Sequence, residues 1–170
     1  PARHPPFQKL VARSRTVDIV VGFVEERARG LFTNSAAYLS GGRIVHIHRK
    51  AFLPTGGMFE EAKFFAPGKS FRTFDTSFGK AGLMVCRDFL SYGAGYALFA
   101  GGADFVIIIS AAPGRGMTTG DAFVTSRMWE LMGEAISYFS TAFVVYCNRV
   151  GFEDGKVFAG GSFKSGREHV

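Results

Sequence analysis

The chain has 170 residues, of which 47% are hydrophobic and 19 are phenylalanine, a composition typical of one globular domain and not of a disordered protein. Its net charge is +6, but the 20 basic residues are scattered in runs no longer than two, which does not indicate a nucleic-acid-binding stripe. No apolar run approaches the roughly 18 residues of a membrane helix, and no signal peptide is recognisable at the start. The two cysteines are too few for a disulfide framework and fit a reducing cytoplasm.

The first half of the chain is predicted to consist mainly of strands. β-Branched and apolar runs indicate the strands, and the pair Gly41-Gly42 between two such runs indicates a tight hairpin turn. The expected elements are a helix end at 5–15, a buried strand at 17–26, a hairpin of 31–40 and 43–50, a loop from Leu53 to Gly68, and a strand pair at 71–76 and 81–86. A loop of that length inside a compact domain is usually functional or disordered.

The second half alternates helices with strands. The expected elements are a helix at 89–102, a fully buried strand at 104–110, a loop at 110–120, a helix at 121–139, a strand at 142–150, and a turn and short strand at 151–163. The helix at 121–139 should begin near Asp121 and pack through Phe123, Met128, Leu131 and Ile136. Hairpins mixed with β-α-β crossovers indicate a layered α/β domain with a mixed sheet.

Cys86 ends an apolar strand-like run in GLMVCRDFL. Such a cysteine is either a small buried packing residue or a nucleophile. A strand-to-helix turn would expose its sulfur at the carboxyl end of a sheet, and a helix N-terminus beside it would favour the thiolate. The backbone N–H of Arg87 would then be placed to serve an oxyanion. Cys147, in the middle of a strand, is expected to be a core residue.

Other chemically active residues are not distinguished by the residue pattern alone. His46 and His48 share one face of a strand, but no third metal ligand is evident, so we interpret them as residues of a half-exposed hairpin and expect no metal. Lys50 and the glutamates Glu25, Glu60 and Glu61 are ordinary polar residues on this reading.

Several segments together resemble the nitrilase (carbon–nitrogen hydrolase) superfamily. HRKAFLP matches the family box that carries a lysine, here Lys50, and FEEAKFFAPG matches the loop that carries an active-site glutamate, here Glu61. GLMVCRDF matches the nucleophile elbow, with Cys86 as nucleophile. The resemblance covers nearly the whole chain and implies an α-β-β-α sandwich, a mixed β-sheet flanked by helices, present here as one partial domain over residues 1–170.

The resemblance implies a mechanism. The Cys86 thiolate would attack an amide-type carbon, a glutamate would move protons, and ammonia or an amine would leave a thioester that water hydrolyses. Lys50 and the Arg87 N–H would stabilise the oxyanion, and Glu61 would hold Lys50 or the attacking water. Asp88 and Glu25 are supporting residues on this reading. The resemblance implies no cofactor, a small-molecule amide-type substrate, and a homo-oligomer in the cytoplasm without nucleic acid or membrane partners.

Two features narrow the expectation. Cys86-Arg87-Asp88 looks more like the amidase and carbamoylase branches than like true nitrilases, in which Trp-Glu usually follows the cysteine. The family's general-base glutamate belongs to a Pro-Glu segment upstream of the helix at 5–15, and the family also continues beyond the last strand. We therefore expect a fragment of a longer enzyme that is inactive by itself. The alternative is a truncated, inactive homologue that serves oligomerisation or partner binding.

Overall fold

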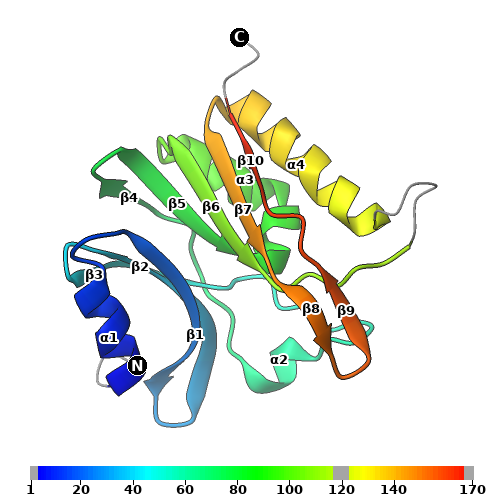
Figure 1. Cartoon of the computed structure of the whole chain (residues 1–170), viewed down its shortest axis with the longest axis horizontal. Helices are drawn as coiled ribbons and strands as arrows, with labels where there is room; N and C mark the ends of the chain where they lie inside the picture. The colour runs from blue at the N-terminus through cyan, green and yellow to red at the C-terminus, as the bar shows by residue number, and fades with distance from the viewer. Residues whose placement is uncertain (1–3, 117–122, 167–170) are drawn as a thin grey trace.

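The structure is a computed structural model that describes residues 4–116 and 123–166. Figure 1 shows its elements, which are α1 (Pro5–Arg13), β1 (Ile19–Ala28), β2 (Leu31–Ser40), β3 (Arg43–Arg49), α2 (Glu61–Phe64), β4 (Thr73–Thr76), β5 (Gly79–Val85), the 3-10 helix η1 (Cys86–Leu90), α3 (Tyr92–Ala100), β6 (Phe105–Ser110), α4 (Val124–Ser140), β7 (Phe143–Asn148), β8 (Val150–Glu153), β9 (Lys156–Ala159) and β10 (Phe163–Ser165). No helix in this part of the chain is long and apolar enough to cross a membrane.

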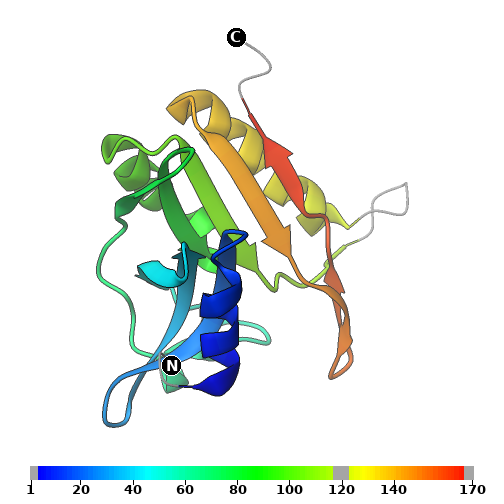
Figure 2. The ribbon, with the colours of Figure 1, turned by 60° about the vertical axis from the view of Figure 1, so that its left-hand side comes forward.

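The elements form four layers in the order helix, sheet, sheet, helix. A three-stranded antiparallel sheet, β1-β2-β3, carries α1 on its outer face, where Phe7 packs against Ala37 and Leu39. Figure 2 shows α1 against this sheet and α4 against the other one. The two sheets bury a core between them that includes Ala36, Tyr38, Leu83 and Val85. The predicted α-β-β-α sandwich is confirmed.

The five-stranded sheet has the order β10-β7-β6-β5-β4. Its central strands β5, β6 and β7 are parallel, and α3 and α4 make the crossovers and cover its outer face. Because parallel strands end at the same edge, the carboxyl ends of β5, β6 and β7 place Cys86, Ser110 and Asn148 at one edge of the sheet.

The predicted hairpin of β2 and β3 is confirmed. Its two-residue turn has φ angles of 60° at Gly41 and 77° at Gly42, which is the left-handed conformation that a type I′ turn needs at both central positions. The turn thereby sets the register that brings β3 to its end at Arg49, directly before Lys50.

Several expectations about burial are wrong. β1 is an edge strand, so Val24 is 59% exposed and only Glu25 in this strand is buried. α4 buries Trp129, Gly133 and Ser137, whereas Met128 and Leu131 are exposed, because its contact face is one residue out of phase with the predicted one. In β6, residues 105, 107 and 109 are only half-buried. The expected helix start at Asp121 lies outside the described residues.

Candidate active site

Cys86 lies in a strained turn at the end of β5. Its φ angle is +47°, a left-handed conformation that is uncommon for a residue with a side chain and costs about 1–3 kcal/mol. The turn directs the chain from β5 into η1, and the cysteine is half-buried with a free thiol. A sharp, strained strand-to-helix turn that exposes a nucleophile is a recurring device of α/β hydrolases. We call Val85–Asp88 the Cys86 elbow.

The expectation that an α-helix begins at this cysteine is wrong. η1 covers Cys86–Leu90, and the α-helix α3 begins only at Tyr92. The macrodipole of α3 therefore does not act on the sulfur at close range, since the effect falls off within a turn.

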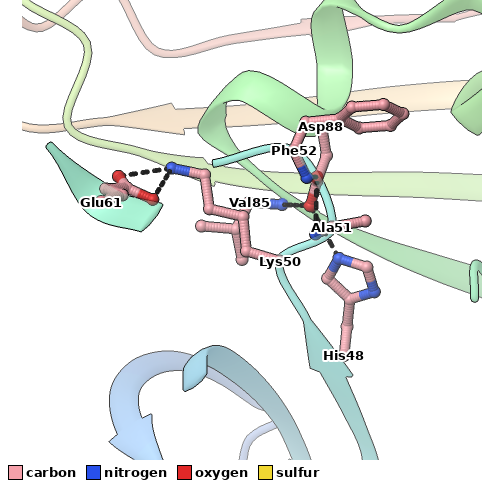
Figure 3. Close-up of polar contacts among 7 residues, drawn as sticks. All are labelled: His48, Lys50, Ala51, Phe52, Glu61, Val85 and Asp88. Atoms are coloured by element: carbon pink, nitrogen blue, oxygen red, sulfur yellow. Dashed lines mark hydrogen bonds and ion pairs between the residues drawn. The ribbon is translucent and has the colours of Figure 1, made fainter. Parts of the chain in front are cut away.

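Asp88 holds the elbow together. Its carboxylate is fully buried and accepts hydrogen bonds on Oδ2 from the Val85 backbone N–H at 3.2 Å and from Nε2 of His48 at 2.8 Å. Its Oδ1 accepts from the backbone N–H groups of Ala51 at 3.0 Å and Phe52 at 2.9 Å (Figure 3). One carboxylate thus fastens the nucleophile turn to the chain segment that follows β3.

Lys50 and Glu61 form a close ion pair. The Nζ atom of Lys50 lies 2.6 Å from Oε1 and 2.7 Å from Oε2 of Glu61, and the lysine is 1% exposed (Figure 3). The backbone of Lys50 is fixed on both sides, because its N–H donates to the Asn34 carbonyl and its own carbonyl accepts from the Gly68 N–H, each at 2.8 Å. A buried ammonium needs such a partner, since desolvation of an unpaired charge is costly.

A cavity of about 750 Å³ opens beside the elbow. Its wall consists of Ala51, Phe52, Leu53, Pro54, Thr55, Gly56, Phe59, Cys86, Arg87, Leu90, Ala112, Pro113, Arg115, Thr125, Met128 and Trp129. Cys86 and Arg87 thus face the cavity, whereas Lys50 and Glu61 are not part of the wall. The roles assigned to these four residues stay predictions. Among the described residues, Arg87 and Arg115 are the charged members of the wall and no carboxylate belongs to it.

Asn148 was not singled out from the sequence. Its side chain accepts a hydrogen bond from the Ala112 N–H at 2.8 Å and donates to the carbonyls of Ala112 at 3.3 Å and Gly160 at 2.8 Å. It therefore fixes the segment after β6 that forms the cavity wall opposite the elbow. Its place at the carboxyl end of a parallel strand was the signal that could have found it.

Glu25 lies away from the elbow, on the α1 side of the three-stranded sheet. Arg49 donates to both of its oxygens at 2.7 Å, and Thr33 and Ser35 donate at 3.2 and 3.0 Å. Burial by itself would raise the pKa of Glu25, but the hydrogen bonds from Arg49, Ser35 and Thr33 and the charge of Arg49 together hold this pKa below its usual value. A carboxylate with its oxygens occupied in this way suits a supporting role.

Two expectations for individual residues are wrong. His48 is 2% exposed and bonded to Asp88, so it belongs to the site region and not to a half-exposed surface, whereas His46 is half-buried. Cys147 is exposed, because the face of β7 opposite the buried Val144 and Tyr146 is not covered by the described residues.

Comparisons with known proteins agree with this geometry. A sequence model of the carbon-nitrogen hydrolase family matches residues 7–164. The chain is 28% identical over 157 residues, or 92% of its length, to a glutamine-dependent NAD(+) synthetase of Acinetobacter baylyi, and covers 28% of that protein. It is 28% identical over 154 residues, or 88% of its length, to the N-carbamoylputrescine amidase of Arabidopsis thaliana, and covers 50% of it.

A solved structure gives the same result. The carbon-nitrogen hydrolase of Helicobacter pylori superposes with a TM-score of 0.83 at 30% identity, over 94% of this chain and 57% of that one. The chain thus spans about half, or less, of the length of these relatives. The ordered motifs, the α-β-β-α sandwich and the family match lead to one conclusion: the chain belongs to the carbon-nitrogen hydrolase family of the nitrilase superfamily.

Proposed function

We propose that the protein hydrolyses the carbon–nitrogen bond of a linear amide or N-carbamoyl compound through a thioester on Cys86. The observation that carries this proposal is the position of Cys86, in a strained elbow at the carboxyl edge of parallel strands and on the wall of a large cavity. Two relatives support the substrate class, because one is named an amidase and the other is named as glutamine-dependent.

The proposed reaction has two stages. The Cys86 sulfur attacks the carbonyl carbon, and the Arg87 N–H together with the ammonium of Lys50 stabilises the oxyanion. The C–N bond then breaks, the nitrogen takes up a proton, and ammonia or an amine leaves the acyl group on the sulfur. Water attacks this thioester, the S–C bond breaks, and the acid is released with the thiol restored.

The proton transfers need a general base. The Glu61 carboxylate is bound on both oxygens to Lys50, so we assign it the task of holding that ammonium in place. We propose that the base is the carboxylate of the family's Pro-Glu segment, supplied by the complete enzyme, and that the chain from Pro1 to Val170 does not turn over by itself.

The experiment uses alkylation of Cys86 by iodoacetamide, followed by intact mass. Because Cys147 is exposed, the measurement is made in a Cys147→Ser background, so that one thiol reports. We expect Cys86 to be alkylated and a carbamoyl or amide substrate to slow this reaction. Alkylation that no member of a panel of glutamine, carbamoyl amines and simple amides slows would contradict the proposal.

A second candidate function is association without catalysis, and one observation favours it. The outer face of α3 and α4 exposes aromatic side chains, namely Tyr92, Tyr96, Phe99, Tyr138 and Phe139. Exposed apolar patches of this kind mark interaction sites. We propose that a second copy of the chain covers this face and that the protein is a cytoplasmic homo-oligomer, in a compartment that keeps both thiols reduced.

Sedimentation velocity tests the oligomer. The double variant Tyr96→Ser with Tyr138→Ser should be monomeric at concentrations at which the natural chain associates. Phe152→Ser, which removes an equally exposed aromatic ring from β8, is the matched control and should leave association unchanged. Equal sedimentation of the natural chain and the double variant would contradict this interface.

A further inference from the structure

A second cavity, of about 400 Å³, lies at the open edge of β3. The segment 68–72 runs beside this edge and is firmly attached to it. The Gly68 N–H donates to the Lys50 carbonyl at 2.8 Å, and a Cβ atom at Gly68 would lie 2.0 Å from the Arg49 carbonyl oxygen, so only glycine allows this approach. The ring of Phe71 stacks on His48 with centroids 5.3 Å apart. The cavity therefore has fixed walls.

The wall of this cavity carries a concentration of positive charge. Its side chains include Arg27, Arg49, Lys69 and Arg72, and among the described residues no carboxylate belongs to the wall. Glu25, outside the wall, neutralises Arg49 through a bidentate pair. Arg27, Lys69 and Arg72 form no ion pair within residues 4–116 and 123–166. Like charges held together repel one another, and a bound anion removes that repulsion.

His46 adds a neutral polar group to the same wall. Its ring stacks on Phe74 with centroids 4.5 Å apart, which fixes its orientation. Burial, and after it the positive charges of His48, Arg49 and Arg72, lower the pKa of His46 to about 4. At neutral pH the ring is therefore uncharged, and its nitrogens can both donate and accept. Ser70 contributes a hydroxyl to the wall as a further donor.

We propose that this basic cavity binds the phosphate group of a small molecule, held by Arg27, Lys69 and Arg72. Guanidinium groups match phosphate oxygens in bidentate geometry, and a lysine adds a point charge. A phosphate dianion balances this wall better than a carboxylate, since a carboxylate carries a single charge. The site is separate from the larger cavity beside Cys86 and goes beyond the proposed hydrolysis.

Calorimetric titration with pyrophosphate and with inorganic phosphate, at constant ionic strength, tests the site. We expect saturable binding with one equivalent, and weaker binding of acetate. Lys69→Ala and Arg72→Ala should each weaken binding by about tenfold, the loss of one charge-assisted contact. Lys156→Ala on β9 and Arg43→Ala at the other end of β3 are the charge-matched controls and should change it by less than about twofold. No saturable binding, or equal losses in the controls, would overturn the proposal.

A second measurement needs only the natural chain. The ring signals of His46 in a ¹H–¹³C spectrum at pH 7 should move with pyrophosphate and saturate together with the heat of binding. His4, exposed at the start of α1, is the internal control and should stay in place. Signals of His46 that do not move, or that move no more than those of His4, would also overturn the site.

Discussion

The Nε2 atom of His48 lies 2.8 Å from Oδ2 of Asp88, and both side chains are fully buried. His48 comes two residues before Lys50, and Asp88 comes two residues after Cys86. This one contact therefore ties the lysine of the proposed oxyanion site to the proposed nucleophile, although 40 residues separate the two partners in the chain. A nucleophile and its oxyanion donor must be held in close register for catalysis, and this pair supplies the connection.

Replacing Asp88 by Asn tests the connection. The amide nitrogen cannot accept a hydrogen bond, so some of the donors around position 88 lose their partner inside the core. We expect Asp88→Asn to lower the free energy of unfolding by about 2–4 kcal/mol and to slow alkylation of Cys86. Urea unfolding and intact mass measure the two effects. Asp75→Asn, an exposed substitution on β4, should change neither quantity. Equal behaviour of the two variants would contradict the role of Asp88.

Lys50 is predicted to act on the oxyanion, so its charge matters more than its packing. Lys50→Met keeps most of the side-chain volume and removes the ammonium. In the complete enzyme we expect kcat/KM for an amide substrate to fall by about a hundredfold or more. Lys63→Met, which removes an exposed lysine paired with Glu60, is the control and should keep full activity. A loss that is confined to KM would show that Lys50 binds substrate and does not stabilise the transition state.

Local patterns predicted much of the fold. The Gly41-Gly42 turn and the apolar runs around it gave β2 and β3, and the change from an apolar run to polar residues at Cys86 located the elbow. The pattern did not predict where α3 begins. The Asp88 carboxylate accepts the Val85 N–H, so the chain first closes into η1 and the α-helix starts only at Tyr92. That hydrogen bond depends on a burial that no helical periodicity reveals.

Contacts between distant segments were beyond the reach of sequence patterns. His48 has the local pattern of an exposed hairpin residue, and only the packing of the hairpin against β5 and η1 buries it beside Asp88. Cys147 shows the reverse case. A strand pattern places it on one face of β7, but whether that face is covered depends on which other elements reach it, and the described residues do not cover it.

Glu25 predicts a pH dependence of stability. Its pKa is held below the usual value of 4.5 in the folded chain, so its network stabilises the fold above that value. This contribution is lost as the pH falls through 4.5 and below, because the unfolded chain takes up the proton first. The difference in urea midpoint between the natural chain and Glu25→Gln should therefore be large at pH 7 and shrink toward pH 3.5. Glu26→Gln, at an exposed neighbouring position, should show no such change. A difference that stays constant with pH would assign the effect to packing.

Arg115 predicts a preference for substrates with a carboxylate. Its side chain and that of Arg87 are the charged groups of the cavity wall among the described residues, and the rest of the wall is largely apolar. The terminal nitrogen Nη2 of Arg115 approaches Gly57, where an added Cβ would lie 3.3 Å from it, so the guanidinium rests against the loop that precedes α2. This contact keeps the charge at the cavity and gives it a defined position. An anionic group of the substrate, away from the reacting carbon, would pair with it.

In the complete enzyme, Arg115→Ala should raise KM by about tenfold for amides that carry a carboxylate and leave KM for neutral amides unchanged, since one charge-assisted contact is lost. Its kcat for both substrates should change little, because the guanidinium binds a part of the substrate that does not react. Arg127→Ala, an exposed arginine on α4 that pairs with Glu130, is the matched control. Steady-state kinetics with a pair of substrates that differ only in the carboxylate measures the effect. An equal rise of KM for both members of the pair would assign Arg115 to the shape of the cavity and not to recognition of charge.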